Sequence, residues 1–176
     1  MTNEILRAME DRRSCKSYES TPVKEEDLDA VLRAGLYAAN GRGQQAPVMV
    51  VLQKEEDVRA LSALNARIMG AKGDPFYGAP AVIVVLVDPA VSTGVEDGSL
   101  VIGNLMLAAS SLGLGSCWIH RAKEEFEREE GKALLKKWGL PENMRGVGHC
   151  IVGYPKAGAY DKPRAPRKEG RIIKAD

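Results

Sequence analysis

The sequence of 176 residues has few cysteines, almost no net charge and no long apolar segment. Its three cysteines, Cys15, Cys117 and Cys150, are too few and too scattered for a disulfide framework, which indicates a reducing compartment. The longest strongly apolar run, 79–87, has about half the length that a membrane-spanning helix requires. The first residues show neither the basic nor the apolar region of a secretory signal. We therefore expect a cytoplasmic protein without a membrane partner.

Charges of opposite sign nearly cancel, since 25 Lys and Arg residues stand against 24 Asp and Glu residues, a formal charge of +1. No bulk excess remains to drive non-specific binding to nucleic acid or to a membrane surface. Any anion site must therefore be local. The length fits one domain over 1–176, and a hydrophobic content of 44% is typical of a soluble globular core.

Hydrophobic spacing and turn residues predict helices that outnumber strands. Strands are expected at 48–53, 81–87, 116–120 and 144–152, and helices at 2–11, from Thr21-Pro22 to about 39, at 54–69, 97–112 and 123–138. The helix at 97–112 is apolar around nearly its whole circumference, which predicts burial inside the domain or against a second copy. Since the crossovers need not all be parallel, we expect an α+β class with a mixed central sheet flanked by helices.

The first motif is the basic run Arg12-Arg13-Ser14-Cys15-Lys16, at the end of the first predicted helix. Two guanidinium groups, a hydroxyl and an ammonium group offer donors suited to a phosphate. A solvated basic turn is the alternative reading of the same five residues.

The second motif is the C-terminal stretch 162–174, whose prolines stiffen the backbone. Its cations are Lys162, Arg164, Arg167, Lys168, Arg171 and Lys174. A disordered basic tail is the alternative. In a nearly neutral chain, however, cations at both ends favour the hypothesis that the two stretches meet at one anion.

The third motif is the turn from Asn40 to Gln45, which contains Gly41 and Gly43. Glycines allow a backbone to approach a ligand closely, and the two amide side chains can donate to or accept from a ring edge. An ordinary turn between a helix and a strand is equally compatible with this pattern.

Four soft ligands, Cys117, His120, His149 and Cys150, suggest a metal site at first sight. The members of each pair stand an odd number of positions apart on one predicted strand, so alternation points them to opposite faces, and we expect no metal site. A Cys–His nucleophile has no evident orienting carboxylate, and a buried apolar strand does not lower a thiol pKa.

Taken in order, the segments resemble the FMN-dependent nitroreductase family. The matching stretches are Arg12 to Lys16, Asn40 to Gln45, Gly78-Ala79-Pro80, Asp97 with Asn104 to Ala109 and Leu112 to Gly115, and Val152 to Pro155 with Lys162 to Arg164. This similarity covers nearly the whole chain. It implies a nitroreductase-like fold and a homodimer with two FMN molecules at the interface, where the apolar helix 97–112 packs against the partner.

The resemblance also implies the residues around FMN. Those of the first motif, Arg12, Arg13, Ser14 and Lys16, would hold the phosphate and ribityl chain, helped by Arg164 or Arg167, between which the sequence does not decide. Asn40, Gly41, Gly43 and Gln45 would approach the same flavin from the opposite subunit. Ile119, His120 and Arg121 would lie beside the ring, and His120-Arg121 occupies a place where the family often has glycine.

The implied reaction is a ping-pong reduction. Hydride would pass from NADH or NADPH to flavin N5, and a nitroaromatic, quinone or similar small acceptor would then occupy the same slot. No side chain has to act as a general acid or base, so no catalytic residue is assigned. Arg121 or His120 would stabilise negative charge on the reduced ring.

Three alternatives stay open at this point. The first is a relative that fragments reduced FMN or removes halogen from an aromatic compound. The second is a flavin-binding dimer without useful turnover, acting as a store or sensor. The third, an anion-binding module unrelated to flavin, predicts a colourless protein.

Overall fold

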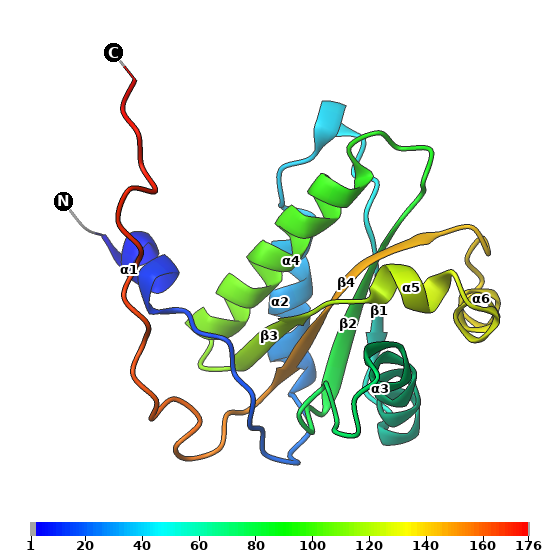
Figure 1. Ribbon diagram of the computed structural model, residues 1–176, viewed down its shortest axis with the longest axis horizontal. Coiled ribbons are helices and arrows are strands. Elements are labelled where there is room, and N and C mark those ends of the chain that lie inside the picture. The colour runs from blue at the N-terminus through cyan, green and yellow to red at the C-terminus, as the bar shows by residue number, and fades with distance from the viewer. Residues whose placement is uncertain (1–2, 176) are drawn as a thin grey trace.

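The computed structural model describes residues 3–175, and a four-stranded sheet lies at its centre (Figure 1). Its strand order is β1 (Val48–Leu52), β2 (Ala81–Val87), β4 (Arg145–Gly153), β3 (Gly115–Ile119). Neighbouring strands pair antiparallel throughout. The expectation of a mixed sheet is therefore wrong for these four strands, and the parallel bridge between Ser14 and Ser116 at the outer edge of β3 lies outside the named strands. The predicted α+β class is confirmed.

Strand β2 divides the core into two clusters. All seven of its residues are buried, as the unbroken apolar run predicted. Val82, Val84 and Leu86 face one cluster, which α3 (Glu55–Met69), α5 (Ala122–Phe126) and α6 (Glu129–Lys137) cover. The alternate residues Ala81, Ile83 and Val85 face the other, under α2 (Glu25–Leu36) and α4 (Gly94–Ser111). Helices thus cover both faces of the sheet (Figure 1).

The start of α2 differs from the prediction. Thr21-Pro22 does not cap the helix; the capping position is Lys24, whose backbone is extended. Val23 is buried in the second core cluster and Lys24 has extended backbone angles, so the helix begins only at Glu25. The acidic first turn, Glu25 to Asp27, lies at the helix N-terminus as its charge requires.

The predicted helix 123–138 is two helices, α5 and α6. Arg128 between them has extended backbone angles, which ends one helix and begins the next. Gly131 then packs against the carbonyl of Glu125, where a Cβ atom would lie 2.1 Å from that oxygen. This tight turn requires glycine, and a smooth helical pattern in the sequence does not reveal it.

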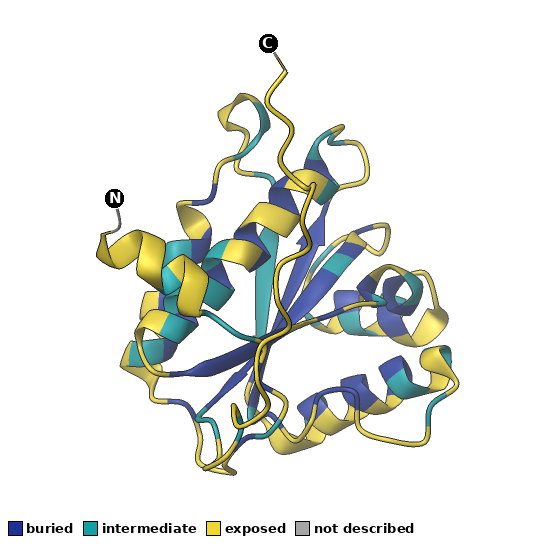
Figure 2. Ribbon diagram, turned by 60° about the vertical axis from the view of Figure 1, so that its left-hand side comes forward, coloured by how far each residue is buried: buried dark blue, intermediate teal, exposed yellow. Residues whose placement is uncertain are grey.

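One face of α4 is left open. Leu105 is fully buried in the core, whereas Leu100 is 49% exposed. Figure 2 shows exposed and buried residues alternating along this helix. Helix α1 (Glu4–Asp11) has no buried residue at all, although it carries apolar side chains. Within the described residues, no helix has the length and hydropathy needed to cross a membrane.

Candidate functional site

The two basic ends of the chain meet, as the sequence analysis predicted. Arg13 donates from Nη1 to the carbonyl of Tyr160 at 2.8 Å and from Nη2 to the carbonyl of Lys162 at 2.5 Å. In the opposite direction, Arg164 donates to the carbonyls of Glu10 and Asp11 at the end of α1. The C-terminal segment therefore runs beside α1 (Figure 1). These contacts bring cations 150 positions apart into one neighbourhood because each guanidinium group satisfies carbonyls of the other segment.

Arg12 lies in the same segment, between Asp11, which contacts Arg164, and Arg13. Its Nη1 atom is buried and has no hydrogen-bond partner among residues 3–175. A buried donor of a charged group without an acceptor costs free energy, so it points to an acceptor that the chain itself does not supply. Ser14 and Lys16 are exposed beside it, and Lys16 Nζ lies 5.4 Å from the ring centroid of Tyr77.

The structure separates the two arginines between which the sequence left the choice open. Arg164 contacts α1 directly, next to the segment that carries Arg12. Arg167 lies three residues further along an exposed stretch and makes no hydrogen bond or ion pair with the part of the chain that the structure describes. The geometry therefore places Arg164, and not Arg167, at the basic cluster.

The outer edge of β3 is open next to the cluster. Cys15 donates its backbone N–H to the carbonyl of Ser116 at 2.8 Å, but from Cys117 onwards no described strand pairs with that edge. The side chain of Ile119 points into the core and the residue pairs with His149 of β4, so Ile119 itself does not face the open edge. His120 is exposed, with its ring 5.5 Å from that of Trp118.

Trp118 is a surface residue that the sequence analysis did not single out. Its side chain is 49% exposed on an edge strand, although tryptophan is a large apolar residue. Its position in the sequence, two residues before His120, could have indicated this, because side chains two positions apart in an extended chain point to the same side.

The turn from Asn40 to Gln45 is rigid. Gly41 donates its N–H to Asp97 Oδ1 at 2.9 Å, and Asn40 Oδ1 accepts from the N–H of Gln45 at 2.9 Å. A Cβ atom on Gly41 would lie 2.2 Å from Thr93 Oγ1, so the turn demands glycine there. Asp97 is therefore a buried anchor of this turn and not the first residue of its helix, since α4 begins at Gly94.

One chain does not bring this turn to the basic cluster. The turn is bonded to the first residues of α4, whereas Arg13 shares a small pocket with Ser110 and Gly113 at its other end. A helix of 18 residues spans about 27 Å. The two predicted parts of the site therefore lie at opposite ends of α4.

Backbone strain gathers at the predicted site. Among residues 3–175, four non-glycine residues have positive φ angles, namely Arg42, Gln45, Tyr77 and Arg121. Two lie in the turn after Asn40, one lies beside Lys16, and Arg121 follows the end of β3 with φ of 81°. Such angles cost about 1–3 kcal/mol for each residue and cluster at functional sites.

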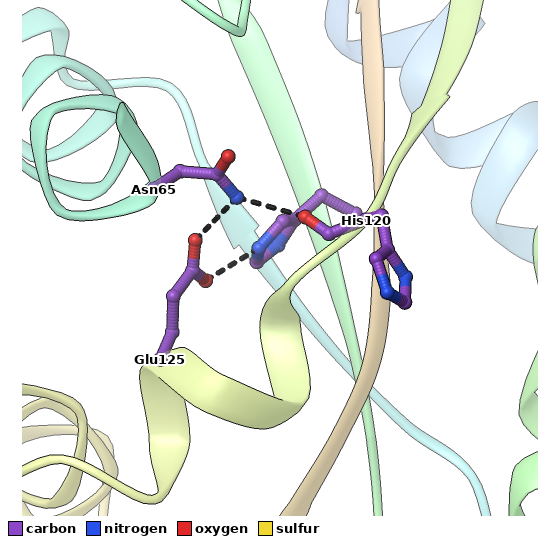
Figure 3. Close-up of polar contacts among 4 residues, drawn as sticks. Asn65, His120 and Glu125 are labelled. Atoms are coloured by element: carbon purple, nitrogen blue, oxygen red, sulfur yellow. Dashed lines mark hydrogen bonds and ion pairs between the residues drawn. The ribbon is translucent and has the colours of Figure 1, made fainter. Parts of the chain in front are cut away.

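A buried polar network that the sequence analysis missed contacts the turn between β3 and α5 (Figure 3). Asn65, Glu125 and His149 come from α3, α5 and β4, and their side chains are fully buried. His149 Nε2 lies 2.6 Å from Glu125 Oε2, and Asn65 Nδ2 donates to Glu125 Oε1 at 2.5 Å. The same Nδ2 donates to the carbonyl of His120 at 2.8 Å. Polar residues at core positions of α3 and α5 were the available signal.

This network corrects one expectation and supports another. His149 does have a carboxylate partner, Glu125, which no spacing in the sequence indicated. The predicted alternation holds, because Cys150 belongs to the opposite core cluster. Burial raises the pKa of both Cys117 and Cys150, so neither thiol is activated as a nucleophile.

Known proteins are similar to this chain in both sequence and fold. The profile of the Nitroreductase family matches residues 9–75 and 64–154. A protein of Archaeoglobus fulgidus, named as a candidate NADH dehydrogenase/NAD(P)H nitroreductase, is 31% identical over 159 residues, which cover 87% of this chain and 86% of its own. A Bacillus subtilis protein named FMN reductase (NAD(P)H) is 25% identical over 189 residues, covering 94% of this chain and 72% of its own.

Comparison of the fold with solved structures also finds nitroreductases. The crystal structure of a nitroreductase with bound FMN from Bacteroides fragilis matches with a TM-score of 0.88 and 30% identity, over 99% of this chain and 100% of that one. Sequence and structure therefore agree over most of the chain, and it belongs to the nitroreductase family.

Proposed function

We propose that this chain is an FMN-dependent NAD(P)H oxidoreductase that works as a homodimer and reduces a small acceptor such as a nitroaromatic compound or a quinone. The observation that carries the proposal is the buried Arg12 Nη1 atom, which lacks an acceptor inside a cluster of cations from both chain ends. Support comes also from the Bacillus subtilis relative, named an FMN reductase, and the Bacteroides fragilis structure, which has FMN bound.

The basic cluster fits the phosphate of FMN. Arg12 offers its unpartnered N–H group, and the exposed Ser14 and Lys16 side chains offer a hydroxyl and an ammonium donor. Arg164 adds a second guanidinium group from the C-terminal segment. Because the whole chain carries only +1, the attraction for a phosphate is confined to this cluster.

The open edge of β3 fits the ring system. Bound FMN would supply the hydride chemistry, and this chain would orient the ring and exclude competing reactions. At His120 and Arg121 the chain leaves β3 without a strand partner, so the N–H groups there are available to a ligand, whereas Ile119 still pairs with His149 of β4. Arg121 or His120 beside the ring would stabilise negative charge that develops on reduction.

A homodimer would complete the site. The turn from Asn40 to Gln45 lies about the length of α4 away from the basic cluster of its own chain, so it can contact the same cofactor only from a second copy. Exposed apolar side chains also point to a partner surface. They include Ile5, Leu6, Met9, Leu36, Tyr37, Leu100 and Leu112.

A cytoplasmic location is part of the proposal. A reaction that draws on NADH or NADPH belongs where these donors are made, and the free thiols Cys15, Cys117 and Cys150 suit a reducing compartment. Their burial protects them within the fold.

Absorbance and rapid kinetics test the proposal. The purified protein should show flavin absorption bands, and anaerobic mixing with NADH or NADPH should bleach them within a catalytic turnover. Comparing the two donors decides which one the enzyme prefers. A colourless protein that does not take up added FMN would refute the proposal, and so would a yellow protein that neither donor reduces.

A further inference from the structure

We propose that Asn65, Glu125 and His149 form a positioning network that fixes the backbone of the turn between β3 and α5 and thereby sets the affinity and reduction potential of the flavin. The inference rests on the proposed function, because that function places the turn at His120 and Arg121 beside the flavin ring. The three side chains touch neither cofactor nor substrate in this account and act only through the turn.

The network reaches the turn at one atom. Asn65 Nδ2 donates to the carbonyl of His120 at 2.8 Å and, with its second hydrogen, to Glu125 Oε1. Glu125 is fixed in turn by His149 Nε2 on its other oxygen, at 2.6 Å. Figure 3 shows the chain of contacts running from the α3 helix to the end of β3. The position of the His120 carbonyl is therefore tied to side chains of three different elements.

The turn needs such support because its backbone is strained. Arg121 has φ of 81° and ψ of 7°, a left-handed conformation that is strained for a residue with a Cβ atom. The carbonyl of Arg121 accepts from the N–H of Glu125 at 3.0 Å, so the residue that bonds Asn65 also closes the first turn of α5. The peptide groups on both sides of Arg121 are thus held, and the N–H groups that would face the flavin cannot relax.

Stability alone gives no reason for this network. Asn65 Oδ1 and His149 Nδ1 are buried without a hydrogen-bond partner among the described residues, and each such atom lowers the stability of the fold. Apolar side chains of similar volume, like the Phe76 ring that packs 5.4 Å from the His149 ring, would fill the space without that cost. The geometry points to a positional role for which the protein gives up stability.

Two pairs of variants test the inference in the flavin-loaded protein. Asn65→Ala removes the hydrogen bond to His120, and Ser62→Ala is its control, because Ser62 lies one turn earlier on α3 and its buried bond goes to Asp74 instead. Glu125→Gln keeps an oxygen acceptor for Asn65, and its NH2 group donates to His149 Nε2 once the imidazole carries its proton on Nδ1, whereas Glu125→Leu offers neither bond. Flavin affinity, midpoint potential, and kcat and KM for the nicotinamide donor are measured for each.

The expected pattern separates position from general destabilisation. Asn65→Ala and Glu125→Leu should each weaken FMN binding about tenfold and shift the oxidised-to-reduced equilibrium about tenfold, which is about 30 mV for a two-electron couple. Their kcat should fall while KM for the donor changes little. Ser62→Ala should lose thermal stability with no shift in potential, and Glu125→Gln should retain the wild-type potential.

A measurement on the flavin-free protein tests the network without requiring that flavin binds. The chain has two tryptophans, so Trp138→Phe leaves Trp118, whose ring lies 5.5 Å from that of His120, as the single emitter. In this background Asn65→Ala should change the Trp118 emission by at least about twofold because the turn moves, and Ser62→Ala should not. If Asn65→Ala does not fold, Asn65→Ser, which retains one donor, should give smaller shifts of the same kind.

The failures are distinguishable. If the wild-type protein binds no flavin, the proposed function fails, and the Trp118 emission still decides whether the network holds the turn. If the wild-type protein binds flavin and a folded Asn65→Ala or Asn65→Ser variant keeps the same potential, flavin affinity and emission, the network has no positioning role. Equal shifts in Ser62→Ala and Asn65→Ala would also overturn the inference, since the effect would then be a general loss of stability.

Discussion

Arg13 Nη1 donates a hydrogen bond of 2.8 Å to the carbonyl of Tyr160, a residue 147 positions later in the chain. The two chain ends are therefore held together by neutral carbonyl acceptors, while the cations that they carry remain near one another without carboxylates to neutralise them all. Like charges at short range repel, so such a cluster gains stability when an anion binds. This relationship supports the proposal that the basic ends form an anion-binding site.

Arg164 and Arg167 should differ in their effect on FMN binding. Arg164→Ala removes a guanidinium group that lies against α1, and a charge-assisted hydrogen bond is worth about 1.5–3 kcal/mol, so FMN should bind roughly 10–100 times more weakly. Arg167→Ala, the matched control, removes an equal charge from the exposed stretch and should change affinity little. Fluorescence titration with FMN measures both. Equal losses would indicate non-specific attraction by the tail.

Subunit mixing should restore binding sites that neither parent has. One variant carries Arg12→Ala with Lys16→Ala, and the other carries Asn40→Ala with Gln45→Ala. If each site takes the basic cluster from one subunit and the turn from its partner, every mixed dimer contains one intact site. After random exchange of equal amounts, about a quarter of the wild-type sites should return.

Flavin content and turnover of the mixture measure this recovery, with the unmixed variants as controls. Native mass spectrometry establishes that the subunits have exchanged. Exchange without recovery would show that one chain supplies the whole site.

Replacing Arg121 separates charge from backbone strain. Arg121→Gly relieves a left-handed residue, and its free energy of unfolding should be about 1 kcal/mol above that of Arg121→Ala, which keeps the strain. Both variants lose the cation, so both should lower the flavin midpoint potential relative to the wild type. Urea unfolding and redox titration give the two quantities. A wild-type potential in either variant would reject the electrostatic role of Arg121.

Alkaline pH should destabilise the protein through its buried acids. Burial raises the pKa of Tyr18 above its ordinary value of 10.0 and that of Cys150 above 9.0. Between pH 9 and 11 the unfolded chain releases protons that the folded chain keeps, so the free energy of unfolding falls as pH rises, by up to about 1.4 kcal/mol per pH unit for each group. Below pH 9 this contribution is complete.

Tyr18→Phe is the variant that checks this sign. It removes the hydroxyl that donates to the carbonyl of Cys15 at 2.8 Å, so the protein should be about 1 kcal/mol less stable at pH 7. Its stability should nevertheless decline less steeply above pH 10 than that of the wild type. An unchanged slope in urea unfolding from pH 7 to 11 would contradict the role of Tyr18.

Elements with strong local patterns were predictable from the sequence. The apolar run of β2 and the glycine-bounded helix α3 match the expected ranges closely, because burial on both faces and end signals act within a few residues. The break between α5 and α6 was not predictable. It depends on Gly131 packing against the Glu125 carbonyl, and the surrounding charged residues continue a helical pattern across it.

Some residues of the candidate site were also predictable from the sequence, and others were not. Arg12 and Arg164 share a neighbourhood that charge alone suggested, yet only the fold distinguishes Arg164 from Arg167. The contact among Asn65, Glu125 and His149 was not predictable from the sequence. These residues meet because α3 and α5 pack on β4, and no spacing along the chain encodes that contact. The residues assigned to cofactor binding stay predictions until binding is measured.

The FMN dissociation constant of the Arg12→Ala, Lys16→Ala double variant tests the central claim most directly. Lys16 is exposed and Arg12 Nη1 has no partner in the described chain, so their loss should leave the fold intact by circular dichroism. FMN should bind at least about 100 times more weakly, and the purified variant should be colourless. A folded double variant that retains the flavin content and affinity of the wild type would contradict the account.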